Sequence, residues 1–365
     1  MRIIRLANFV TPRSGGLRTA LRELGAGYAA AGHEPILVVP GERAADEQHP
    51  QGRVVTLPGP VVPGLGGYRV LLDKKQLVRT LTELKPDSLE VSDRTTLRWT
   101  GAWAREQRIG SVMVSHESLN GLLRVTRLPG GVRRRLATRL NRATARAYDR
   151  IVCTTEWAAD EFHHAGATNV VQVPLGVDLD HFQPGRRSAE LRTSLAGPDE
   201  ILLVCATRLS VEKRPQRALT TLAALRARGV PARLVMAGDG PLRTRLTKAA
   251  EGLPVSFTGW ISDRAELAAL QATADVVLAP GPIETFGLAA LEALACGTPV
   301  VASASSALPG VLGSAGVSAP GEDFSAEVLS LLGRPDARER ARRRAEEFSW
   351  AAAVRGFLRV HEELP

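Results

Sequence analysis

Residues 279–301, APGPIETFGLAALEALACGTPVV, decide how this chain of 365 residues folds. The apolar run Val276–Leu278 just before them predicts a buried strand. A Pro/Gly turn follows, and a helix begins near Thr285 and ends where Gly297 and Pro299 stop it. Strand, turn and helix in this order are typical of an α/β sheet with parallel strands.

The start of this predicted helix is suited to an anion. N–H groups at a helix start lack partners within the helix and carry partial positive charge, so the amides of Phe286, Gly287 and Leu288 form a candidate anion cradle. Glu284 precedes the helix and Glu292 lies eight positions on, about two turns away, where it could hold a ribose diol. Such glutamates are commonly just solvated. Here an Ala/Leu-rich helix surrounds Glu292, and because an unpaired buried carboxylate is costly, a functional role is favoured.

The strand and helix alternation runs through both halves of the chain. The pattern lapses around residues 174–185 and resumes with a short apolar run at 201–206. We therefore expect an N-terminal domain over 1–182 and a C-terminal domain over 183–343, both Rossmann-like and doubly wound and facing a central cleft. Strands are predicted at 3–10, 34–39, 54–57, 88–91, 111–114, 150–153 and 169–173, then at 201–206, 233–238, 255–258, 276–279 and 299–303, and a last helix over 336–363.

Composition excludes several classes of protein. No apolar run reaches the ~18 residues of a membrane span, and the chain opens on a strand pattern without a signal peptide's features, so a cytoplasmic protein is expected. The three cysteines, Cys153, Cys205 and Cys296, are far apart and outside any CxxC motif, so neither a disulfide framework nor a zinc site is indicated.

The net charge of +9 is concentrated in one segment. Arg124–Arg150 holds nine arginines and one acid, Asp149. A helix is predicted there whose apolar residues recur at helical spacing (Leu136, Leu140, Ala143, Ala147) beside a basic face (Arg135, Arg139, Arg142, Arg146). It is suited to an anionic membrane surface or an acidic lipid head group, and the alternative is a solvated Arg-rich helix. Nucleic acid is disfavoured because no aromatic residues interleave with the arginines.

Other candidate residues follow the carboxyl ends of predicted strands, where ligands collect in open α/β sheets. Gly15 and Gly16 could let the backbone of the segment 11–16 approach a ligand closely. Asp93 and His116 end two strands of the first half. Arg208 and Lys213 follow the first strand of the second half, and Gly238 ends the next one; fixed cations there would hold a diphosphate.

The spacing E-x7-E from Glu284 to Glu292, with Phe286-Gly287 and a downstream Gly-Thr-Pro-Val, resembles the signature of retaining family-4 glycosyltransferases of GT-B fold. Further segments look like actinobacterial GDP-mannose-dependent phosphatidylinositol mannoside mannosyltransferases: residues 6–9, 14–19, 90–93, 115–117, 152–155, 209–213 and 280–282. The resemblance implies an α-mannosyl transfer from GDP-mannose to a hydroxyl of a phosphoinositide lipid, and a C-terminal helix, 344–365, that crosses back to the N-terminal domain.

The resemblance also implies roles for single residues. Arg208 and Lys213 correspond to the pyrophosphate pair, the backbone of Gly259-Trp260-Ile261 to the nucleobase contact, and His116 to a sugar-positioning residue. Glu284 would hold sugar hydroxyls, although the spacing alone also permits a nucleophile. Asp93 is a candidate acceptor contact. Arg214 departs from the family pattern, because a Gly often follows the lysine there.

The implied mechanism needs no metal and no cofactor. Asp178-Leu179-Asp180 spells the DxD of metal-dependent transferases but lies in the interdomain stretch, so we interpret it as structural. The leaving diphosphate, stabilised by the two cations and the helix amides, would take up the acceptor's proton. A soluble glycosyltransferase or cyclitol-joining relative, acting on a small-molecule natural product with another nucleotide sugar, remains an alternative. So does a nucleotide-sugar binding protein without turnover, which the intact candidate set argues against.

Overall fold

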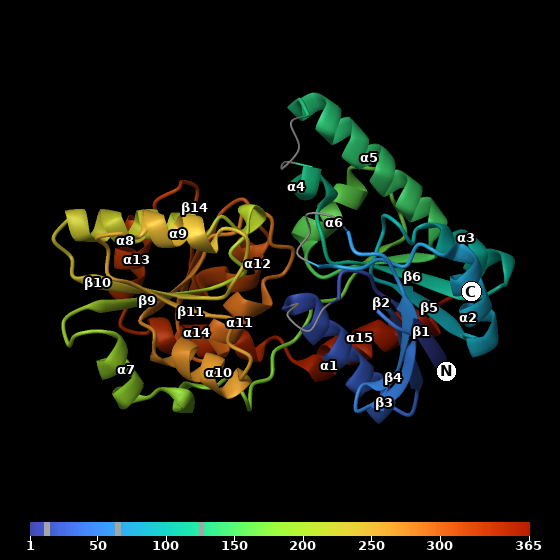
Figure 1. The fold of residues 1–365 in the computed structure, drawn as a ribbon, viewed down its shortest axis with the longest axis horizontal. Helices are drawn as coiled ribbons and strands as arrows, with labels where there is room; N and C mark the ends of the chain where they lie inside the picture. The colour runs from blue at the N-terminus through green and yellow to red at the C-terminus, as the bar shows by residue number, and fades with distance from the viewer. Residues whose placement is uncertain (11–14, 63–66, 124–127) are drawn as a thin grey trace. The chain divides into compact units, whose positions relative to one another are not determined.

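The computed structural model describes residues 1–10, 15–62, 67–123 and 128–365, and these form two compact units (Figure 1). Unit 1 comprises Met1–Leu175 together with Trp350–Pro365, and unit 2 comprises Gly176–Ser349. The chain thus passes from one unit to the other after Leu175 and after Ser349. The sequence predicts these boundaries after residues 182 and 343.

Unit 1 is built on an eight-stranded sheet with the order β3-β4-β2-β1-β5-β6-β7-β8. Its strands are β1 (Arg2–Leu6), β2 (Glu34–Gly41), β3 (Ala45–His49), β4 (Gly52–Pro58), β5 (Ser88–Val91), β6 (Gly110–Ser115), β7 (Arg150–Cys153) and β8 (Val170–Gln172). All neighbouring pairs are parallel except β3 with β4. Because helices lie on both faces, the central strands are buried, and Ile3, Ile4 and Leu6 of β1 are fully buried.

The helices of unit 1 connect these strands, and three of those described begin at side-chain caps. They are α1 (Gly16–Ala30), α2 (Lys74–Leu84), α3 (Trp99–Glu106), α4 (Leu119–Leu122), α5 (Gly130–Ala147), α6 (Glu156–His163) and, from the end of the chain, α15 (Trp350–Glu362). The side chains of Asp73, Ser118 and Thr155 accept backbone N–H groups at the starts of α2, α4 and α6.

The strand β3 is absent from the sequence prediction. Its residues, ADEQH, are polar and mostly exposed, and they lie at the sheet edge, antiparallel to β4. An edge strand that buries no face shows no apolar periodicity, so pattern analysis had no signal for it.

Unit 2 contains a six-stranded, fully parallel sheet with the order β11-β10-β9-β12-β13-β14. Its strands are β9 (Ile201–Ala206), β10 (Ala232–Ala237), β11 (Val255–Gly259), β12 (Val276–Ala279), β13 (Val300–Ser303) and β14 (Val317–Ala319). Its α-helices are α7 (Ala189–Leu195), α8 (Gln216–Ala227), α9 (Arg243–Ala249), α10 (Arg264–Thr273), α11 (Leu288–Ala295), α12 (Leu308–Leu312), α13 (Ser325–Leu332) and α14 (Ala337–Glu346), with short 3-10 turns η2 (Pro184–Arg186), η3 (Val211–Lys213) and η4 (Gly313–Ala315). The two predicted Rossmann-like sheets are confirmed.

The predicted single helix over 336–363 is wrong. The structure has two helices, α14 and α15, and residues 347–349 break them apart. The carbonyl of Phe348 accepts the N–H of Val177 at 3.0 Å, and Ser349 pairs with Val177 in an isolated parallel bridge. This pairing takes the backbone groups that a continuous helix would use, so the helix stops there.

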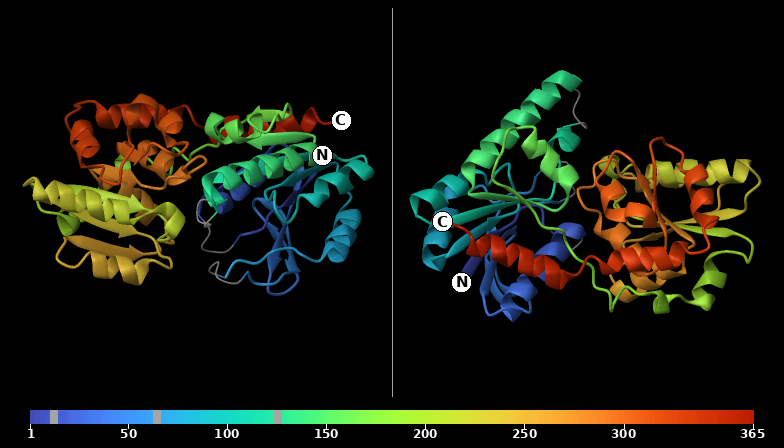
Figure 2. Two further views of the ribbon diagram at one scale, coloured as in Figure 1. Left: turned by 90° about the horizontal axis from the view of Figure 1, so that it is seen from above. Right: turned by 180° about the vertical axis from the view of Figure 1, so that it is seen from behind.

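The return of α15 to unit 1 confirms the expected packing of the C-terminal helix. α15 lies against α1 (Figure 2). A Cβ placed on Gly27 of α1 would be 2.2 Å from Cγ2 of Val354, so this glycine allows the two helices to approach closely.

A buried ionic cluster also anchors α15. Glu90 of β5 accepts hydrogen bonds from Arg5 Nε (2.7 Å) and the Tyr28 hydroxyl (2.8 Å), and lies 3.2 Å from Nε2 of His361 on α15. Burial opposes ionisation of Glu90, but the charge of Arg5 and the hydrogen bond with His361 outweigh it and hold its pKa well below the usual range. Nδ1 of His361 lies 2.7 Å from the Ser88 hydroxyl. The last helix is therefore tied to the centre of the sheet.

The prediction of which face of the basic helix packs against the protein is wrong, because the buried residues lie one position after the predicted apolar ones. In α5 the buried residues are Ala137, Asn141 and Thr144, whereas Leu136 is exposed. A shift of one residue rotates a helix by about 100°. Asn141 and Thr144 are polar and therefore did not register as packing residues, yet Thr144 bonds back to the carbonyl of Leu140 and Asn141 is buried against Glu161.

Candidate functional site

The predicted donor residues of unit 2 gather at the carboxyl edge of its sheet, in the turns that follow β9, β10, β11 and β12. These turns are linked to one another by backbone hydrogen bonds: Leu209 N–H donates to Asp239 O (3.0 Å), and Gly238 N–H to Gly259 O (2.7 Å). A Cβ on Gly238 would lie 2.0 Å from the carbonyl oxygen of Thr207. Close backbone packing therefore explains the glycine at 238, and its contact with a donor stays a prediction.

Lys213 and Glu284 are brought together from separate turns. Lys213 ends η3 after β9, and Glu284 lies between β12 and α11; Nζ is 2.5 Å from Oε1. Both side chains are partly buried, with 29% and 21% exposed. A Cβ on Gly281 would come within 3.2 Å of Glu284 Oε1, so the turn encloses the pair closely. In this state the ammonium is neutralised by a carboxylate, and a diphosphate would have to replace that carboxylate as its partner.

The helix start predicted from the sequence is confirmed at α11. Gly287 is its N-cap residue with φ +83°, a conformation that favours glycine, and a Cβ there would be 2.4 Å from Cδ2 of Leu308. Phe286 is buried and packs edge-to-face with Phe348. Because the first N–H groups of a helix have no partner within it, the amides around Leu288 remain the best candidate for an anion cradle.

The remaining donor candidates of unit 2 lie near the same edge. Arg208 follows β9 on the loop that also carries Lys213, and Glu292 lies on α11; both are partly buried. Gly259 ends β11 with φ +75°, and the large aromatic side chain of Trp260 beside it is 44% exposed, with Ile261 following. Base recognition by this turn stays a prediction.

In unit 1, His116 directly follows β6, beside the end of β5. Its Nε2 lies 3.3 Å from the Ser92 hydroxyl. Burial lowers the pKa of His116 to about 4, so the imidazole is neutral near pH 7. A neutral imidazole offers one donor and one acceptor, which suits a sugar hydroxyl.

Asp93 has an internal role in the structure. Its carboxylate accepts hydrogen bonds from Asn8 Nδ2 (2.8 Å) and from the backbone and hydroxyl groups of Thr95 and Thr96. Asn8 Oδ1 in turn accepts the N–H of Leu71 at 2.9 Å. These bonds fix the loops that follow β1 and β5, and a contact of Asp93 with an acceptor stays a prediction. Sequence analysis missed Asn8, whose only signal was an amide at the end of an apolar strand.

Gly15 and Gly16 stand at the start of α1, Gly15 as its N-cap residue. A Cβ on Gly15 would meet no atom within 4 Å, so packing among the described residues does not require glycine there. Residues 11–14 of the same predicted loop lie outside the described residues.

The DxD motif has partners of its own. Asp178 accepts the N–H of His181 at 3.0 Å and lies 3.6 Å from Arg264. Within the described ranges, no group of three or more His, Cys, Asp or Glu side chains is arranged to hold a metal ion.

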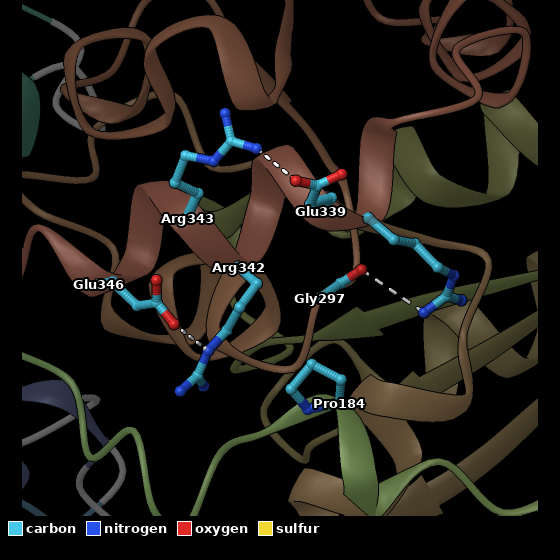
Figure 3. A pocket seen from close by; sticks show the side chains of 7 residues that line it. Pro184, Gly297, Glu339, Arg342, Arg343 and Glu346 are labelled. Carbon is cyan, nitrogen blue, oxygen red and sulfur yellow. Dashed lines mark hydrogen bonds and ion pairs between the residues drawn. The ribbon is translucent and has the colours of Figure 1, made fainter.

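A cavity of about 430 Å³ in unit 2 lies elsewhere, beside α14 (Figure 3). Arg338, Arg342 and Arg343 line it together with Pro184 and Gly297. Arg338 donates a hydrogen bond to the carbonyl of Gly297. Figure 3 shows Arg342 and Arg343 paired with Glu346 and Glu339 of the same helix. These arginines already serve the packing of α14, and none of the predicted site residues lines the cavity.

No helix among residues 1–10, 15–62, 67–123 and 128–365 combines the length and apolar character that crossing a bilayer demands.

Two family models match consecutive parts of the chain: "Glycosyltransferase Family 4" over residues 14–181 and "Glycosyl transferases group 1" over residues 187–348. A similar relative is the GDP-mannose-dependent alpha-(1-6)-phosphatidylinositol dimannoside mannosyltransferase of Mycobacterium tuberculosis. It is 51% identical over 98% of this chain and 95% of its own length.

Solved structures share the fold at lower identity. Sucrose-phosphate synthase from Thermosynechococcus elongatus superposes with a TM-score of 0.82 at 21% identity, covering 99% of this chain and 98% of that one. HepE from Anabaena, solved with UDP and glucose, superposes with a TM-score of 0.77 at 18% identity over the full length of both chains.

Proposed function

The chain belongs to the family-4 glycosyltransferases of GT-B fold, and we propose that it transfers an α-mannosyl group, with retention, from GDP-mannose to a hydroxyl of a phosphatidylinositol mannoside. The observation that carries this proposal is the 51% identity, over nearly the whole of both chains, to an enzyme named for that donor and that lipid. A cation, a carboxylate and a helix start lie together at one sheet edge of unit 2, and this arrangement supports the same chemistry.

For the donor, we assign the diphosphate to Lys213, Arg208 and the first amides of α11. Lys213 already faces an anion at 2.5 Å, the carboxylate of Glu284. When a diphosphate takes over the ammonium, Glu284 is freed to accept hydrogen bonds from hydroxyls of the mannosyl group. Charge-assisted bonds of this kind are the strong ones in proteins, and they strengthen as charge develops on the leaving group.

The reaction needs no protein nucleophile in this proposal. As the bond between the mannosyl C1 and the diphosphate oxygen breaks, Arg208, Lys213 and the helix amides stabilise the charge on the departing oxygen. That oxygen stays on the face that the acceptor hydroxyl attacks, and takes up its proton. His116, neutral near pH 7, holds a sugar hydroxyl without adding charge.

For the acceptor, α5 is the element that fits a lipid surface. The first two turns of α5 are exposed except for a partly buried Arg133, and the first buried side chain is Ala137. Three apolar side chains are exposed at this end, Leu128 (38%), Val132 (50%) and Leu136 (36%), among the arginines of the basic segment. Apolar side chains surrounded by arginines favour insertion into the head-group region of an anionic membrane. Arg124, the first residue of that segment, lies outside the described residues.

The donor assignment is tested with the full chain and labelled nucleotide sugars. GDP-mannose, UDP-glucose and ADP-glucose are offered with phosphatidylinositol mannosides in vesicles, and lipid-linked label is measured. Transfer from GDP-mannose alone is expected. Transfer from another donor, or to a water-soluble acceptor only, would favour the alternative of a small-molecule glycosyltransferase.

The acceptor surface is tested by vesicle sedimentation. Leu136→Asp should reduce binding to vesicles that contain phosphatidylinositol, because it places a charge in the apolar patch, while GDP binding stays unchanged. Leu332→Asp, at an exposed leucine of unit 2, is the matched control. Equal vesicle binding by both variants would exclude α5 as the docking element.

A further inference from the structure

Arg214, directly after Lys213, has a backbone conformation that ordinarily requires glycine. Its φ is +46° and its ψ +50°, in the left-handed region. For a residue with a Cβ this conformation is disfavoured by a factor of about five to thirty. Glycine adopts this conformation freely, so this chain gives an arginine the backbone shape that a glycine takes without cost.

The side chain of Arg214 has a partner that offsets part of this strain. Its Nη1 donates to Oε1 of Glu322, which follows β14, at 2.8 Å. The same oxygen accepts Nη2 of Arg217 at 2.8 Å. The hydrogen bond from Arg217, helped by the charges of both arginines, lowers the pKa of Glu322. One carboxylate therefore holds both Arg214, which follows η3, and Arg217, in the first turn of α8.

Arg217 connects this carboxylate to the turn that carries Glu284. Arg217 is 5% exposed, and its Nη1 donates to the carbonyl of Pro280 (3.1 Å) and to the Ser303 hydroxyl (3.0 Å). Pro280 follows β12 and begins the segment that leads to Glu284, and Ser303 ends β13. The contacts thus join the ends of three neighbouring strands to the loop of Lys213.

We infer that Arg214, Arg217 and Glu322 form a loop clamp that positions Lys213 for the donor diphosphate, an inference that rests on the proposed function. Lys213 immediately precedes the left-handed residue, so a change of Arg214 to a right-handed conformation redirects the lysine side chain. Glu322 keeps Arg214 in place, and Arg217 holds Glu322 against the sheet edge. The three are positioning residues, because the hydrogen bonds that they make go to one another and to the protein.

The test separates backbone strain from charge at position 214. Arg214→Ala removes the ion pair and keeps the disfavoured backbone, whereas Arg214→Gly removes both. GDP affinity, measured by calorimetry, and KM for GDP-mannose are expected to be about five- to thirty-fold worse in Arg214→Ala than in Arg214→Gly. Equal losses in both variants would mean that the guanidinium itself binds the nucleotide, and would overturn the clamp.

A double variant tests whether Glu322 acts through Arg214. Glu322→Gln alone should weaken GDP binding, because the strained Arg214 loses its anion. Adding Arg214→Gly should restore much of the affinity, since no strain remains to be held. If the double variant is as weak as Glu322→Gln or weaker, Glu322 does not act through the conformation of Arg214, and the inference fails.

Arg108 provides a matched control. It is an exposed arginine in unit 1 with φ +58°, far in sequence from the site. Arg108→Gly should have a higher melting temperature than Arg108→Ala, because only glycine relieves the left-handed backbone, and both variants should leave GDP affinity unchanged. A change of GDP affinity in these variants would show that general stability, rather than the position of Lys213, sets the affinity.

The wild-type isotherms distinguish this inference from the proposed function. If the wild type binds UDP or ADP instead of GDP, the donor proposal fails and the same variants are compared with the nucleotide that binds. If the wild type binds GDP and the Ala and Gly variants behave alike, only the loop clamp fails.

Discussion

Replacing Glu284 by glutamine should change donor binding and sugar transfer in opposite directions. In the free enzyme Lys213 is held by Glu284 at 2.5 Å, and GDP must displace that carboxylate. The two side chains are 21–29% exposed, so the free energy of this ion pair is near the upper end of the values for exposed ion pairs, about 1 kcal/mol. Removing the charge of Glu284 releases the ammonium, and GDP should bind about fivefold more tightly.

Transfer should fall in the same variant. Glu284 is assigned hydrogen bonds to the mannosyl hydroxyls, and bonds to a charged group contribute about 1.5–3 kcal/mol. Their loss should lower kcat/KM by about ten- to 150-fold. Calorimetry with GDP and a transfer assay measure the two effects. Glu190→Gln, at an exposed glutamate of α7, is the control. A tenfold weaker GDP affinity in Glu284→Gln, or undiminished transfer, would refute the assignment.

Three further predictions concern charge at other positions. Arg208→Ala should weaken GDP binding about ten- to 150-fold and also lower the rate of transfer. The control Arg228→Ala, at an exposed arginine, should change neither. Calorimetry measures the GDP affinity of both variants. The pKa of His116 falls to about 4 on folding, so the unfolded chain binds more protons than the folded one between pH 6.5 and 4. Lowering the pH through this window should therefore destabilise the fold by up to about 3 kcal/mol. In His116→Gln the melting temperature should depend less on pH over the same window. Glu90→Gln should leave Arg5 buried without its anion and lower the free energy of unfolding by about 3–5 kcal/mol. Glu34→Gln, in an exposed pair with Arg2, should lower it by less than about 1 kcal/mol. Urea titrations of both variants measure the difference.

What could be predicted from the sequence was set by local patterns. The strand before α11, the glycine at 287 and the stop at Gly297 are each visible within a few residues, because they follow from apolar periodicity and backbone freedom. The same reasoning placed Arg208, Lys213 and Glu284 at the carboxyl ends of strands. Parallel strands bring those ends to one edge, so the meeting of Lys213 with Glu284 follows from topology.

What could not be predicted either lacks an apolar pattern or depends on partners far apart in the chain. β3 has no apolar face, and the break between α14 and α15 is made by Val177, about 170 positions away. The shifted face of α5 has a related cause, since Asn141 and Thr144 are buried through hydrogen bonds that no hydropathy pattern encodes. Long-range polar pairing is the information that a local pattern lacks.

The arginine at 214 shows how such pairing changes the meaning of a motif. In the sequence, Arg214 is a departure from the pattern of the resemblance, in which glycine, the residue that adopts a left-handed backbone freely, often follows the lysine. In the structure the left-handed turn is present, and Glu322, 108 positions away, accepts the guanidinium. The shape of the loop is therefore kept by a different means, through side-chain charge instead of a missing Cβ. A residue that takes a glycine's backbone conformation is consequently judged together with its distant partner. In this mannosyltransferase that partner is the carboxylate of Glu322, which follows β14, the last strand of unit 2.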